Sequence, residues 1–284
     1  MNHLPNHLHY RADIAGSASL NKARSIVEIF RHTLGSDSAE KVWSIDHHSI
    51  RTPNDIYATS PTSFYVTNDH HYREGHMRDI EDLLNHQTAP WSDVVHVAIS
   101  ENRARDGSIL IEAATALSGL HNPNGLGHGA HPDEVLIVDA SGGVLIFAQR
   151  NLDDHASRNL TIVEHIQLDS TLDNPSYYHD AYATVANNAS GYILAGLARA
   201  ADLSKASHDT DTRIPVMVWQ VRSTGESGKW EKKLIFQDDG KQIRSASAAV
   251  LVGIDPKENG GKKQAWLFVT GFLSDAMVAS KVDL

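Results

Sequence analysis

The sequence predicts an all-β protein built from many short strands. Runs of Val, Ile, Leu, Tyr and Phe alternate with Gly, Asn, Asp and Ser along the chain, and this spacing is typical of strands joined by tight turns. Two hairpins stand out. Residues 134–150 (EVLIVDASGGVLIFAQR) enclose Gly142 and Gly143 between two β-rich runs, and residues 180–198 repeat the pattern around an Asn, Ser and Gly tip. Helical signal is scarce, and it is clearest at 76–87 (HMRDIEDLLNHQ).

The remaining strands follow from the same signal, and the total is about sixteen. They are predicted at 25–33, 41–46, 92–100, 108–115, 160–169, 214–223, 230–239, 247–255, 264–272 and 277–284, with others inside 51–71. Residues 19–30 fit a helix or a strand, whereas 1–16 carry no strand or cap signal. Many strands of similar length, without long helices between them, point to a sandwich, a barrel or a propeller.

Composition narrows the function classes. The chain has 284 residues, 41% of them hydrophobic, and a net charge of −10, which disfavours binding to nucleic acid phosphates and is compatible with binding cations. No apolar run approaches the roughly 20 residues of a membrane-spanning helix. There is no cysteine, so disulfides and thiolate metal sites are excluded. The first residues lack the apolar segment of a secretory signal, and the compartment stays open.

Three polar motifs precede predicted strands: Pro53-Asn54-Asp55-Ile56, 122–126 (NPNGL) and 172–175 (LDNP). Each fits a turn, because Asn, Asp, Pro and Gly favour turns for backbone reasons. Together they also supply two carboxylates and three amide oxygens, the hard ligands that calcium takes in sets of about six to eight. A propeller brings the starts of separated strands to one central axis more easily than a sandwich does.

The motifs NDIYATSPTSFYVTNDHHY, HNPNGL, LDNPSYY and the segment from 245 to the C-terminus resemble the serum paraoxonase/arylesterase family in order and approximate spacing. The resemblance implies a six-bladed β-propeller of the paraoxonase type over residues 1–284, with an insertion at 198–213. It also implies calcium-dependent hydrolysis of lactones, aryl esters and some organophosphates, with a small-molecule ester or lactone as substrate. A gluconolactonase- or strictosidine-synthase-like propeller is the alternative within the same fold.

Site residues carry over from the matching motifs. The resemblance implies that Asn54, Asn124, Asp173 and Asn174 bind a catalytic calcium, that Asp55 binds a second, structural calcium, that His3 (or His7 in a shifted register) is the catalytic histidine, and that His47, Asp69 and His70 support or line the site. By the same resemblance, the side chains of Asn68 and Asp69 support the site without binding the metal.

The chain departs from the family at its beginning. The matching proteins have roughly a further third of sequence there, with a Glu-Asp pair that binds both calcium ions and a second catalytic histidine. We therefore expect an incomplete propeller, missing its first blade or more, and weaker calcium binding, because affinity follows the charge and rigidity of the ligand set. A second hypothesis is a catalytically impaired propeller remnant that serves as a binding scaffold. The His128–His131 pair offers a further, weaker alternative, a zinc site.

Overall fold

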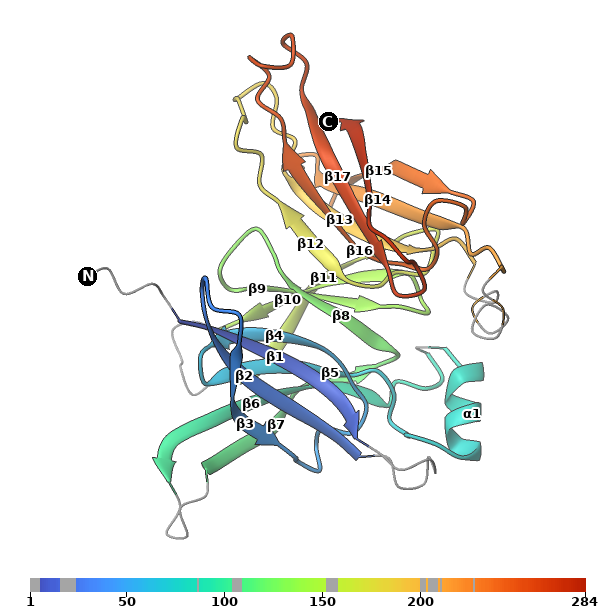
Figure 1. The fold of residues 1–284 in the computed structure, drawn as a ribbon. Helices are drawn as coiled ribbons and strands as arrows, with labels where there is room; N and C mark the ends of the chain where they lie inside the picture. The colour runs from blue at the N-terminus through green and yellow to red at the C-terminus, as the bar shows by residue number, and fades with distance from the viewer. Residues whose placement is uncertain are drawn as a thin grey trace, which may run out of the picture. The chain divides into compact units, whose positions relative to one another are not determined.

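The structure, a computed structural model, describes residues 6–15, 24–85, 87–103, 109–151, 158–199, 203, 209, 211–226 and 228–284. Within these ranges it contains eighteen strands and one helix of more than a turn (Figure 1). Their bounds are β1 Asn6–Ala15, β2 Arg24–Thr33, β3 Ala39–Ile45, β4 Pro53–Ser60, β5 Ser63–Asn68, α1 His76–Leu83, β6 Ser92–Arg103, β7 Ile109–Leu120, β8 Pro123–His128, β9 Glu134–Asp139, β10 Val144–Arg150, β11 Leu160–Gln167, β12 Pro175–Tyr178, β13 Gly191–Leu197, β14 Val216–Ser223, β15 Trp230–Asp238, β16 Ala246–Gly253, β17 Gln264–Gly271 and β18 Val278–Asp283. None of the described helices is long and apolar enough to span a membrane.

The strands form five sheets in which neighbours in sequence are neighbours in space. The orders are β1-β2-β3, β4-β5-β6-β7, β11-β10-β9-β8, β12-β13-β14-β15 and β16-β17-β18. Every strand pair whose register is known is antiparallel, as in the β9–β10 hairpin, where Val144 faces Asp139. Gly143 has φ 65° in the turn of that hairpin, a conformation that glycine adopts without steric cost. The prediction of an all-β fold is confirmed.

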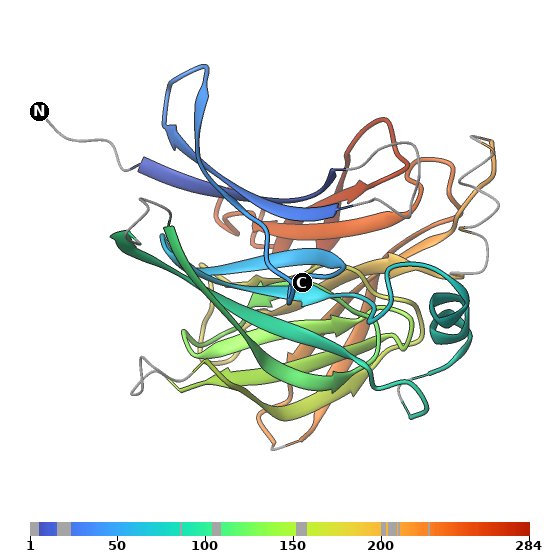
Figure 2. The same cartoon turned by 90° about the horizontal axis from the view of Figure 1, so that it is seen from below.

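The chain divides into two compact units. The first comprises Met1–Asn124 with Asn151–Leu160, and the second comprises Gly125–Arg150 with Thr161–Leu284, so the boundary falls inside β8. In the first unit, buried Val27, Ile29 and Ile45 from sheet β1–β3 share one hydrophobic core with Phe64 and Val95 from sheet β4–β7. Helix α1 lies at the end of the second of these sheets, where β5 ends and β6 begins (Figures 1 and 2).

In the second unit, strand β13 shows that the sheets are stacked face to face. All seven of its residues are buried. Tyr192 and Leu194 belong to a core shared with β9 and β10, whereas Ile193 and Ala195 belong to a core shared with β16 and β17. Because successive side chains of a strand point to opposite faces, sheet β12–β15 is covered on both sides. Stacked antiparallel meanders are consistent with a propeller-like fold.

Several local expectations are corrected. Residues 6–15 form β1, where we expected no strand. Residues 24–33 form β2, which confirms the strand predicted at 25–33 and decides between the helix and the strand that residues 19–30 left open. We expected both strands of a hairpin within residues 180–198. Only β13 lies there, and it pairs with β12, which lies upstream at Pro175–Tyr178. Helix α1 is confirmed, but its apolar residues Met77, Ile80 and Leu83 are exposed.

Candidate functional site

Asn54 and Asp55 lie inside a strand and not in a turn. In the β4–β5 ladder, Pro53 faces Asn68 and Ile56 faces Val66, so that Asn54 and Asp55 together oppose the single residue Thr67. This two-against-one pairing is a β-bulge, which locally disrupts the ladder and redirects side chains. Pro53 can begin this strand because a first position needs no ladder N–H. Asn54 is exposed and Asp55 half-buried.

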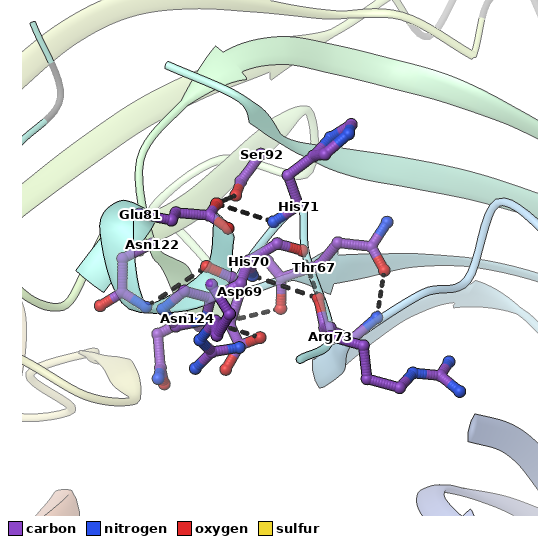
Figure 3. Close-up of polar contacts among 12 residues, drawn as sticks. Thr67, Asp69, His70, His71, Arg73, Glu81, Ser92, Asn122 and Asn124 are labelled. Carbon is purple, nitrogen blue, oxygen red and sulfur yellow. Dashed lines mark hydrogen bonds and ion pairs between the residues drawn. The ribbon is translucent and has the colours of Figure 1, made fainter. Parts of the chain in front are cut away.

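The hydroxyl of Thr67 connects the bulge to the third motif residue of this unit. The Asp55 backbone N–H donates to Thr67 Oγ1 at 3.0 Å, and Thr67 Oγ1 lies 2.7 Å from the Asn124 carbonyl oxygen, to which it donates (Figure 3). Thr67 is fully buried. One hydroxyl therefore holds the backbones of Asp55 and Asn124 together, although these residues are far apart in the sequence. Sequence reasoning missed Thr67.

The side chain of Asn124 has a buried acceptor atom without a hydrogen-bond partner among the described residues. Its Oδ1 atom is buried and accepts no hydrogen bond from the described residues. A buried polar atom without a partner costs about 1–3 kcal/mol, and such atoms are rare in folded proteins. An amide oxygen in this state is suited to bind a cation. Asn124, like Asn54, lies within a strand, here β8, and not in the turn that its neighbours Pro123 and Gly125 suggested.

Asn68, although it begins the second Asn-Asp pair, is a structural residue. Its Oδ1 accepts the backbone N–H groups of Arg51 and Thr52 at 2.7 and 3.0 Å. Its Nδ2 donates to the Ser49 carbonyl at 2.8 Å and to Asp93 Oδ1 at 2.6 Å. Four hydrogen bonds satisfy the amide, and the side chain is buried. Asn68 thus ties the loop before β4 to the start of β6.

Asp69 and His70 follow directly at the end of β5. His70 is buried; its Nε2 atom lies 2.9 Å from Asp82 Oδ1. Its Nδ1 atom lies 3.1 Å from Asp69 Oδ1, but the angles do not make a hydrogen bond. Asn122, in the left-handed region with φ 47°, donates its Nδ2 to the Asp69 carbonyl at 3.3 Å. Asp69 and His70 are thereby attached to the segment that leads into Asn124.

Asp173 and Asn174 belong to the second unit, where they precede β12. Their backbone N–H groups donate to the carbonyls of Ala195 and Ser247, both at 2.9 Å. Gly125 packs against the same backbone: a Cβ placed on it would lie 2.5 Å from the Asp173 carbonyl oxygen and 2.7 Å from Asn174 Cα. Only glycine fits there. The start of β8 in this unit therefore lies against the Asp173–Asn174 segment.

The histidines that the resemblance assigns to the site lie in different parts of the chain. His3 lies outside the described residues, and His7, the alternative register, pairs with His32 in the β1–β2 ladder. His47 lies in the turn between β3 and β4, where its Nδ1 accepts the Ser49 N–H at 3.2 Å. Burial and the neighbouring His48 lower the pKa of His47, and Asp46 opposes them. Within the described ranges, no three His, Asp or Glu side chains gather as a metal cluster.

Several four-stranded antiparallel meanders are consistent with a propeller-like fold, and amide and carboxylate side chains lie in or just before strands β4, β8 and β12. The Arylesterase family model matches residues 18–250, and the chain therefore belongs to the arylesterase family. Serum paraoxonase/arylesterase 2 of Homo sapiens is 28% identical over 153 residues, which are 54% of this chain and 38% of that protein. The protein of the same name from Gallus gallus is 31% identical over equal shares.

The chain thus matches well under half the length of these curated relatives. Among solved structures, a luciferin-regenerating enzyme aligns with a TM-score of 0.42 and 11% identity, covering 95% of this chain and 75% of that chain. That similarity is too low to carry an argument about fold or function.

Proposed function

We propose that the protein is a calcium-dependent hydrolase of lactones or aryl esters. Membership of the arylesterase family supports the reaction class. The observation that carries the proposal is the buried Asn124 Oδ1, an oxygen that accepts no hydrogen bond from the part of the chain that the structure describes, beside a strand whose bulge contains Asn54 and Asp55. Amide and carboxylate oxygens are the donors that calcium prefers over softer metals.

The proposed ligands of the catalytic ion are Asn54, Asn124, Asp173 and Asn174, and Asp55 is assigned to a second ion. The chemistry of these donor atoms fits calcium. All five donors are hard oxygen ligands, and the Oδ1 atom of Asn124 is buried without a hydrogen-bond partner among the described residues, a cost that a cation would offset. With Asp173 the single carboxylate among the four, we expect modest affinity, because the affinity for calcium rises with ligand charge.

A calcium ion bound there supplies Lewis-acid polarisation of the ester carbonyl. His3 is proposed as the base that removes a proton from the attacking water. Asp69 and His70 are proposed to line or support the pocket, and His47 to support it from the turn before β4. We further propose that the five sheets are blades of a six-bladed propeller of the paraoxonase type, forming one domain.

The test is hydrolysis of phenyl acetate and of a γ-lactone by the full chain, with calcium and after EDTA. We expect EDTA to abolish turnover and added calcium to restore it. Asp173→Ala removes the one carboxylate of the catalytic set and should lower kcat/KM at least about 100-fold. Asp169→Ala, an exposed acidic residue four positions upstream, is the matched control and should match the wild type.

Turnover that survives EDTA, or an Asp173→Ala variant as active as Asp169→Ala, contradicts the proposal. A wild-type chain without calcium-dependent turnover supports instead a propeller that acts as a binding scaffold.

A further inference from the structure

Helix α1 is held in place by its charged residues and not by its apolar ones. Met77, Ile80 and Leu83 are 40%, 44% and 86% exposed, whereas Glu81 is 1% exposed. The residue before the helix, Gly75, makes no side-chain cap hydrogen bond. An eight-residue helix is too short to be stable alone in water. Polar contacts must therefore fix its position, and Glu81 is the place to look for them.

The Glu81 carboxylate accepts hydrogen bonds from three donors. Its Oε1 accepts the His71 backbone N–H at 2.7 Å and the Ser92 hydroxyl at 3.2 Å, and its Oε2 accepts the Tyr72 backbone N–H at 3.0 Å (Figure 3). Charge-assisted hydrogen bonds of this kind are about twice as strong as neutral ones. The buried carboxylate is tolerated because both of its oxygens accept hydrogen bonds. Glu81 thus joins α1 to the segment after β5 and to the start of β6.

The segment that Glu81 holds begins one residue after His70. On the other side of His70, Thr52 fixes the chain: its Oγ1 donates to the His70 carbonyl at 2.5 Å, and its own carbonyl accepts the Asp69 N–H at 3.0 Å. The helix also reaches the His70 ring directly, through Asp82 Oδ1 at 2.9 Å from Nε2. Asp69 and His70 are therefore held by contacts with Thr52 on one side and with α1 on the other.

We propose that Glu81 is a positioning residue for the hydrolytic site, acting through the backbone of His71 and Tyr72 to place Asp69 and His70. This inference rests on the function proposed above. Loss of the Glu81 carboxylate would weaken the hydrogen bonds of both backbone N–H groups, since an amide keeps only one acceptor oxygen, and would loosen the helix that also carries Asp82. Substrate is not in contact with Glu81 in this scheme, so the effect falls on turnover and not on substrate binding.

The experiment compares Glu81→Gln with Asp79→Asn, which removes the same charge from an exposed position on the same helix, where the carboxylate side chain is 75% exposed. Hydrogen exchange of the His71 and Tyr72 amides reports the anchor itself, and kinetics on phenyl acetate and a γ-lactone in calcium report its consequence. For Glu81→Gln we expect both amides to exchange faster and kcat to fall about 10- to 100-fold, with KM within about twofold. Glu81→Asp keeps the carboxylate and should restore part of kcat.

Several outcomes decide the matter. A wild-type chain that hydrolyses neither substrate overturns the proposed function and this inference with it. An active wild type whose Glu81→Gln variant has the kcat of Asp79→Asn overturns this inference alone, as do unchanged exchange rates at both amides. Should Glu81→Gln not fold, Ser92→Ala removes one of the three donors and replaces it in the comparison, with an expected fall in kcat of about threefold.

Discussion

At the scale of single residues, the two Asn-Asp pairs show how one dipeptide serves two purposes. The side-chain amide of Asn68 accepts two hydrogen bonds from protein groups and donates two to others. Asn54 lies exposed in the β4 bulge. The resemblance of the motifs implies metal binding by Asn54 and a supporting role for Asn68. The hydrogen-bond partners of Asn68 come from residues 49–52 and from Asp93, and no local sequence pattern identifies them.

We therefore predict opposite consequences for the two alanine variants. Asn68→Ala leaves buried donors and acceptors of the Ser49–Thr52 loop and Asp93 without partners, and should lower the free energy of unfolding by about 3 kcal/mol or more. Asn54→Ala should change it by less than about 0.5 kcal/mol in calcium-free buffer, because the side chain is exposed, while weakening calcium binding. Urea unfolding and calcium titration of both variants measure this. Equal stability losses would contradict the distinction.

At the scale of elements, the sequence predicts strands well where hydrophobic runs meet turn residues, as in β9 and β10. It fails for β8, whose residues PNGLGH include Pro, Asn and Gly, which disfavour strands, and for β12, whose four residues PSYY are too few to show a period and begin with Pro. Pairing within the sheet overrides that preference: β8 is bonded to β9 and β12 to β13. Gly125, which suggested a turn, is needed here because the backbone of Asp173 and Asn174 approaches it closely.

Gly125→Ala should disturb the start of β12. The new Cβ would meet the Asp173 carbonyl oxygen at 2.5 Å and Asn174 Cα at 2.7 Å, both backbone atoms, so the Asp173–Asn174 segment has to move. We expect a loss of about 1–3 kcal/mol in stability and weaker calcium binding. Gly253→Ala is the control, because the three atoms nearest its new Cβ would be side-chain atoms of Tyr178 and Tyr182 and not backbone atoms of the Asp173–Asn174 segment. Comparable calcium affinity in the two variants would count against the role given to Asp173 and Asn174.

At the scale of the whole molecule, regular meanders are predictable from sequence, but the stacking of the sheets is not. Strand β13 is buried on both faces only because sheets β8–β11 and β16–β18 both pack on its sheet, a set of contacts between residues distant in sequence. The local sequence also does not predict which compact unit each proposed ligand belongs to. Asn54, Asp55 and Asn124 belong to the first compact unit, and Asp173 and Asn174 belong to the second.

The proposed ligand set predicts a calcium-dependent melting temperature for the whole chain. Calcium that binds the folded state alone, at 100 times its Kd, stabilises it by about 2.7 kcal/mol, and we expect Tm to rise by about 5 °C or more. EDTA should reverse the rise. Asn124→Ala in the first unit and Asp173→Ala in the second test the assignment independently, and each should reduce the shift. Magnesium should raise Tm less, because it demands near-octahedral geometry and gives up its water reluctantly. Scanning calorimetry with each ion measures these shifts, and an equal response to both ions, or an undiminished response in either variant, would show that the calcium ligands lie elsewhere.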